Sequence, residues 1–158
     1  MKRTPATHRT HLSNGLRVVL CPTPHLTEAH VGVFFEVGSR YEASEENGLT
    51  HVLEHMLFRG TKRYRTSNDL NAAAENIGGV LNAATYRDHV VFSLGCHADE
   101  LREAISILSD MLQAPRYRAL EVERAIIQEE LLESLDEKGR CIDADSLLHR
   151  LIFGGQGL

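Results

Sequence analysis

The stretch GLTHVLEHMLF, residues 48–58, predicts a helix with an apolar side and a polar side that carries two histidines and a glutamate. Residues four apart lie on one face of a helix, so His51 and His55 can direct two imidazole rings at one point. This geometry is typical of a divalent transition-metal site, and zinc is the metal that it favours. Glu54 lies at the edge of the same face, where a carboxylate can accept a proton from a metal-bound water.

The alternative interpretation of this stretch is a polar helix face exposed to solvent. The apolar residues of the same stretch argue against it, because they predict that much of the helix is buried. Imidazole and carboxylate groups close to a core need partners.

Two histidines do not complete a catalytic zinc site, which usually takes three protein ligands. A later helix, predicted over 118–136, carries Glu123 and Glu130 seven residues apart, nearly on one face. We predict that Glu130 is the third ligand and that Glu123 is an outer carboxylate that orients a ligating histidine. A purely structural zinc site would need a fourth protein ligand, for which His89 and Cys96 are candidates, although their spacing supports neither.

The chain around the motif predicts an α+β fold in one domain over 1–158. Strands are expected at 16–21, 29–37, 80–85 and 89–94, the last two forming a hairpin, and further helices at 67–77, 101–112 and 143–152. These elements predict a two-layer sandwich, with a mainly antiparallel sheet and helices packed on one of its faces.

Local signals add detail to three of the predicted helices. Asn47 is the expected N-cap of the motif helix, and Ser67 is the expected N-cap of the helix at 67–77. One apolar stripe is expected to face the core from the helix at 101–112, and it consists of Leu101, Ile105, Leu108 and Leu112.

Composition excludes several classes of protein. The 158 residues, 42% hydrophobic and 25% charged, are enough for one domain with a core. A net charge of −5 without a basic block speaks against a nucleic-acid partner. No apolar run approaches the ~18–20 residues of a membrane span, and the basic start of the chain lacks the apolar region of a secretory signal. We therefore expect a cytoplasmic protein, with the periplasm as the other compartment, and three reduced cysteines that serve as packing residues.

Beyond the motif, the sequence resembles the pitrilysin, insulin-degrading enzyme and mitochondrial processing peptidase family of inverted zincins, whose motif is HxxEH. Five segments carry the resemblance in the family's order: LSNGLRV (12–18), VGSRYE (37–42), HVLEHMLFRGT (51–61), IGGVLNA (77–83) and ERAIIQEEL (123–131). Two stretches depart from the family pattern, namely residues 52–53, where an aromatic is common, and residues 87–89.

The resemblance implies a zinc-dependent endopeptidase with one Zn²⁺ per chain. Its ligands would be His51, His55 and a glutamate of the later helix, with Glu130 ranked ahead of its neighbour Glu129. Glu54 would be the general base that activates the zinc-bound water, and the substrates would be extended or unfolded peptides.

The resemblance also implies how a peptide and a partner would bind. Asn82 and Ala83 would lie on an edge strand that holds the peptide backbone by β-augmentation. Family members pair two related domains into a clamshell, so this chain would be most of an N-terminal catalytic domain, and its loop-like end at 154–158 fits a piece of a longer architecture. We expect it to be weak or inactive alone, and to need a second homologous domain or a partner chain in a homo- or hetero-oligomer.

The alternative function is a non-catalytic, peptide-binding or partner subunit of a processing-peptidase-like complex. Such subunits usually lose residues of the motif. This sequence retains His51, Glu54, His55, Glu123 and Glu130, and it therefore favours the enzyme.

Overall fold

A computed structural model of the chain describes residues 6–154. The first residues of the basic start, 1–5, and most of the predicted loop-like end, 155–158, lie outside the described residues.

The centre of the fold is a three-stranded antiparallel sheet in the order β3-β5-β4. Its strands are β3 (Glu28–Phe35), β4 (Val80–Thr85) and β5 (Val90–His97). β4 and β5 form the predicted hairpin, which is closed by the Tyr86 N–H donating to the His89 carbonyl at 2.8 Å. β4 is therefore at one edge of this sheet, as the family resemblance implied for the segment with Asn82 and Ala83.

A second, smaller hairpin pairs β1 (His8–His11) with β2 (Arg17–Leu20). The turn between them contains Asn14, whose side chain accepts a hydrogen bond from the Leu16 N–H at 3.1 Å. The pair Asn14-Gly15 therefore lies in the turn of a hairpin. β1 was not predicted, because its polar sequence HRTH has no alternation of apolar and polar residues and all four residues are exposed.

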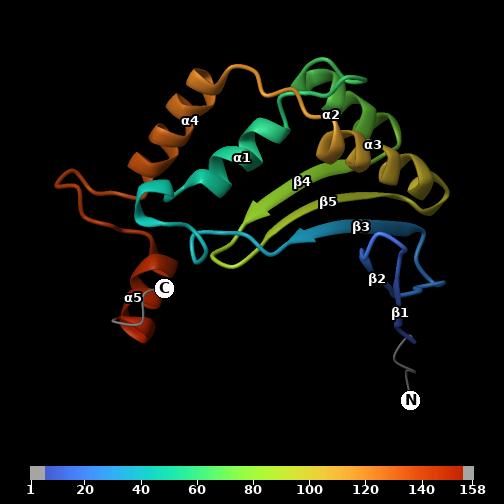
Figure 1. Cartoon of the computed structure of the whole chain (residues 1–158), viewed down its shortest axis with the longest axis horizontal. Coiled ribbons are helices and arrows are strands. Elements are labelled where there is room, and N and C mark those ends of the chain that lie inside the picture. Colours follow the sequence, from blue (N-terminus) through green and yellow to red (C-terminus); the bar gives the residue numbers. More distant parts are fainter. Residues whose placement is uncertain (1–5, 155–158) are drawn as a thin grey trace.

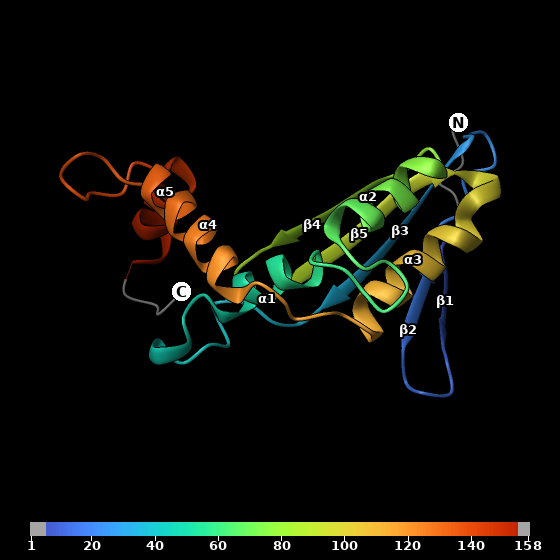
Figure 2. The same cartoon turned by 90° about the horizontal axis from the view of Figure 1, so that it is seen from above.

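Helices α1 (Leu49–Leu57), α2 (Ser67–Asn76) and α3 (Leu101–Gln113) lie on one side of the three-stranded sheet (Figure 1). α4 (Leu120–Glu133) packs on α1, and α5 (Ala144–Phe153) lies beyond the strand ends, away from α2 and α3 (Figures 1 and 2). Two short 3-10 turns, η1 (Ser44–Glu46) and η2 (Ala98–Glu100), precede α1 and α3. The predicted α+β class, with helices against one face of an antiparallel sheet, is confirmed.

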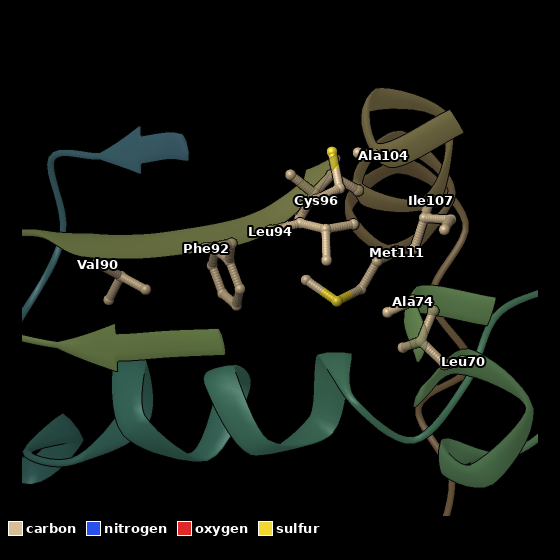
Figure 3. Close-up of a cluster of buried hydrophobic side chains, with 10 residues drawn as sticks. Leu70, Ala74, Val90, Phe92, Leu94, Cys96, Ala104, Ile107 and Met111 are labelled. Atoms are coloured by element: carbon tan, nitrogen blue, oxygen red, sulfur yellow. The ribbon is translucent and has the colours of Figure 1, made fainter. Parts of the chain in front are cut away.

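The core lies between β5 and helices α2 and α3 (Figure 3). Every second residue of β5 is buried, as expected for a central strand with one covered face. These residues are Val90, Phe92, Leu94 and Cys96. Leu70 and Ala74 of α2 pack in the same cluster, together with the buried residues of α3.

The predicted apolar stripe of α3 is only partly correct: Leu108 is buried and Leu112 packs against the core, but Leu101 and Ile105 do not face it. The buried residues of α3 are Ala104, Ile107, Leu108 and Met111, whereas Leu101 and Ile105 are 37% and 48% exposed. Two apolar stripes share Leu108, and the sequence periodicity of either one predicts a helix equally well. The stripe that includes Ala104 faces the sheet, where α3 packs against β5.

The predicted helix starts also need correction. α2 is capped by Thr66, not Ser67, and a reciprocal capping box joins Thr66 to Asp69. Asn47 does not cap α1, whose N-cap is Gly48 at φ +95°, a backbone conformation that favours glycine.

Only one of the three cysteines packs as predicted. Cys96 is buried in the core, Cys141 is half-buried and Cys21 is exposed. Within residues 6–154, no helix combines the length and the apolar composition that a membrane crossing requires.

Candidate metal centre

The first turn of α1 is held by the carboxylate of Glu42, which lies in the loop before it. Its two oxygens accept hydrogen bonds from the backbone N–H groups of Gly48 and Thr50, each at 2.7 Å. Partial burial acts to raise the pKa of Glu42, but the bonds from the Thr50 hydroxyl and these two N–H groups outweigh it and hold the pKa below its ordinary value. This carboxylate replaces the missing side-chain cap of the helix and places His51 one residue beyond it.

Three predicted ligands from α1 and α4 meet at one point. The Nε2 atoms of His51 and His55 are 3.1 Å apart, and Glu130 Oε2 lies 3.7 Å and 3.5 Å from them. Their ligand atoms all lie within 4.8 Å of one another. Ligands about 2.0–2.1 Å from a tetrahedral ion are separated by roughly 3.3–3.4 Å, so this group fits a single zinc ion.

The openness of the group suits a catalytic rather than a closed site. The side chain of His55 is 17% exposed, whereas those of His51 and Glu130 are 36% and 45% exposed. Two imidazole nitrogens and one carboxylate oxygen form a ligand set found in catalytic zinc sites. The exposed side leaves space for a water molecule or a substrate.

Glu123 lies behind His55 and is itself buried, with 2% of its surface exposed. The Nδ1–H of His55 donates to Glu123 Oε2 at 3.0 Å, because an ionised carboxylate can only accept. This bond leaves the His55 Nε2 lone pair directed at His51 and Glu130. The other oxygen of Glu123 contacts a guanidinium nitrogen of Arg59.

Glu54 points toward the sheet instead of joining the three-residue group. Its Oε2 accepts a hydrogen bond from the Thr85 hydroxyl at the end of β4. The carboxylate is half-buried and tied to the strand that forms the edge of the sheet.

The predicted substrate-binding residues lie on that edge strand, which also contacts α1. Asn82 is exposed and pairs in register with Ser93, while Ala83 is half-buried and pairs with Phe92. Their roles toward a peptide stay predictions.

The other candidates from the sequence do not join the group. The exposed Glu129 precedes Glu130, but Glu130 is the glutamate whose carboxylate approaches the histidines. His89 instead donates from its Nδ1 to the Asp88 carboxylate at 2.8 Å, and Cys96 belongs to the core cluster. Neither residue supplies a fourth ligand, so the structure gives no support to the structural-zinc interpretation.

Three residues around the group were not singled out from the sequence: Glu42, Arg59 and Thr85. Arg59 lies beyond the end of α1, where the helical spacing from His55 no longer determines which way a side chain points. Thr85 ends the predicted strand 80–85, but no sequence pattern shows that it reaches Glu54. The capping role of Glu42 depends on a loop conformation that its sequence does not reveal.

Comparison with known proteins adds an independent observation. A family model described as Insulinase (Peptidase family M16) matches residues 17–152. The mitochondrial-processing peptidase subunit beta of Dictyostelium discoideum is 40% identical over 160 residues, which cover 100% of this chain and 34% of that protein. An uncharacterized zinc protease of Streptomyces coelicolor is 35% identical over 152 residues, 95% of this chain and 32% of that protein.

Solved structures share the fold. A protease from Helicobacter pylori matches with a TM-score of 0.78 and 27% identity, covering 84% of this chain and 32% of that one. Pitrilysin matches with a TM-score of 0.73 and 29% identity, covering 84% of this chain and 14% of that one. The chain spans about a third of the length of the curated relatives it matches.

Proposed function

Because the chain belongs to the insulinase family, peptidase family M16, we propose that it is the zinc-binding, catalytic part of a metalloendopeptidase that cleaves extended or unfolded peptides. The observation that carries the proposal is the convergence of His51, His55 and Glu130 from two helices. The separations of their ligand atoms suit one zinc ion. A helix face that is only polar and exposed to solvent would not require these three side chains to converge.

Each residue of the site has a separate role in the proposed hydrolysis. His51, His55 and Glu130 would hold the ion, and Glu123 fixes the ring of His55 through its Nδ1–H. Bound zinc supplies a Lewis acid that polarises a carbonyl and lowers the pKa of water toward about 7. The Glu54 carboxylate accepts a proton from the attacking water and returns it to the leaving amine. The Thr85 hydroxyl keeps that carboxylate turned toward β4.

The exposed edge of β4 supports extended peptides as the substrate class. A peptide that adds to this edge as a further strand would bind through its backbone, with Asn82 and Ala83 beside it. The base Glu54 accepts a hydrogen bond from Thr85, which lies on the same strand as these two residues. Thr85 is three residues after Asn82 and two residues after Ala83. A bound strand would therefore pass close to the catalytic carboxylate.

The length of the relatives supports a requirement for a partner. Because this chain matches only about a third of them, we propose that a second homologous domain or a partner chain completes the substrate enclosure. The chain alone would then bind zinc but hydrolyse peptides weakly or not at all. Robust cleavage of an unstructured peptide by this chain alone would contradict that part of the proposal. A cytoplasmic location stays a prediction.

The test is the zinc content of the 158-residue chain purified without chelator, beside Glu130→Ala and Glu129→Ala variants. The two variants delete the same group at adjacent positions, so they are matched for every effect other than position. We expect about one zinc per chain in the parent and in Glu129→Ala, and much less in Glu130→Ala.

Two other results would contradict the proposal. An absence of zinc in a folded parent offered the metal would mean that these residues do not form a metal site in this chain. Loss of zinc in Glu129→Ala with retention in Glu130→Ala would show that the third ligand is assigned to the wrong glutamate.

A further inference from the structure

Arg59 is a cation in contact with the buried carboxylate behind His55. One oxygen of Glu123 accepts from the imidazole, and the other contacts the guanidinium of Arg59. The carboxylate is thus held from both sides while its side chain is only 3% exposed. The side chain of Arg59 is 28% exposed.

Both partners reach one carboxylate from the end of α1. His55 lies in the last turn of α1, and Arg59 lies two residues beyond the helix, where its N–H donates to the Met56 carbonyl at 3.2 Å. Glu123 lies in the first turn of α4 and meets them there. Arg59 therefore follows directly on the last turn of α1, which carries the histidine that Glu123 contacts.

The contact matters because Arg59 brings a positive charge to a site that is rich in carboxyl groups. Glu54, Glu123 and Glu130 bring three carboxyl groups to the region of two histidines, and Arg59 is a cation in direct contact with one of them. A buried carboxylate without a cation is costly to hold, and its neighbours rearrange to relieve the cost. A guanidinium remains charged at all physiological pH and can fix the plane of a carboxylate.

We propose that Arg59 is a positioning residue for the zinc ligand His55 and acts through Glu123. It holds the Glu123 carboxylate in the plane that accepts the Nδ1–H of His55, and the Nε2 lone pair of His55 then faces Glu130. This inference rests on the proposed zinc function. The competing explanation is an ordinary ion pair that joins α1 to α4 and has no influence on the metal.

The experiment measures the zinc dissociation constant of the 158-residue chain by competition with a chromophoric chelator. The variants are Arg59→Met, Arg59→Lys, Glu123→Gln and the double variant Arg59→Met/Glu123→Gln. Arg63→Met is the matched control, because Arg63 also forms ion pairs, to Glu103 and Asp110, on an exposed surface. Urea unfolding of each metal-free variant reports stability separately.

We expect Arg59→Met to weaken zinc binding by about 10- to 100-fold, the usual effect of removing an outer partner of a metal ligand. Arg59→Lys should recover much of the loss, and Arg63→Met should bind like the parent. Glu123→Gln should also weaken binding, and the double variant should bind no more weakly than the weaker-binding single variant, because Arg59 acts through Glu123.

Several results would overturn the inference. Arg59→Met could bind zinc as tightly as Arg63→Met, in which case the ion pair is only structural. The losses of Arg59→Met and Glu123→Gln could multiply in the double variant, in which case Arg59 does not act through Glu123. If Arg59→Met fails to fold, the double variant is compared with Glu123→Gln, since neither protein has an unpaired buried charge. Equal zinc affinity of these two proteins would support action through Glu123, and weaker binding by the double variant would contradict it. A folded parent that binds no zinc would instead refute the proposed metal site itself.

Discussion

Removal of the Glu42 carboxylate should loosen the start of α1 and lower the free energy of unfolding. The substitution Glu42→Ala deletes the acceptor of two 2.7 Å bonds, from the N–H groups of Gly48 and Thr50. Loss of a side-chain helix cap costs about 0.5–2 kcal/mol, and the two charged bonds here place Glu42 in the upper part of that range. Water can reach the half-buried N–H groups, which limits the expected loss to about 1–2 kcal/mol.

The assay is urea unfolding of the parent, Glu42→Ala and the control Glu45→Ala. Glu45 is an exposed glutamate of η1, and its deletion should change stability by less than about 0.5 kcal/mol. For a chain of this size, the loss in Glu42→Ala corresponds to a fall in Tm of about 2–8 °C. Zinc affinity should fall as well, since the first turn of α1 carries His51.

The same pair of proteins tests the pH dependence. The folded-state pKa of Glu42 lies below its unfolded value, so its stabilising effect is fully present above about pH 4.3. That effect is lost as the pH falls through the lowered folded-state pKa. The stability difference between parent and Glu42→Ala should therefore be constant at neutral pH and shrink in acid. A loss equal to that of Glu45→Ala, or a difference that grows in acid, would refute the capping role.

Two further substitutions probe the chemistry and the core. Glu54→Gln should leave the zinc content unchanged and reduce hydrolysis by about 10²- to 10⁴-fold in a peptidase-competent assembly, measured with a fluorogenic peptide. Loss of zinc in this variant would identify Glu54 as a ligand instead of a base. Leu94→Ala, at a fully buried position of β5, should cost about 2–5 kcal/mol in urea unfolding. Leu151→Ala on α5, where the side chain is 84% exposed, should cost less than about 0.5 kcal/mol, and equal losses would contradict the assigned core.

Part of the candidate site could be predicted without tertiary structure because it is local. His51 and His55 lie on one face of any helix that contains both, and the structure brings their Nε2 atoms within 3.1 Å of each other. The residues that support them could not be found in this way. Arg59 matters only because α4 brings Glu123 to it, and Thr85 matters only because β4 ends beside Glu54.

The packing of α3 shows the same limit in the core. The sequence predicted the helix correctly, but periodicity alone could not distinguish the stripe through Leu101 and Ile105 from the one through Ala104 and Ile107. Contact with β5 selects the second stripe. The strand β1 was missed for a related reason, since its pairing with β2 depends on a turn and not on its own polar residues.

The sequence by itself determined the α+β class, the hairpin of β4 and β5, the paired histidines and the two glutamates of α4 that could serve them. These features follow from periodicities and spacings within single segments, where the backbone dictates which side chains share a face. The tertiary structure decided that Glu130 and not Glu129 faces the histidines, that Glu123 is buried between His55 and Arg59, and that Glu42 caps α1. Each of these contacts joins segments that are distant in sequence or linked by an irregular loop, so it exists only once α1, α4 and the sheet have packed together.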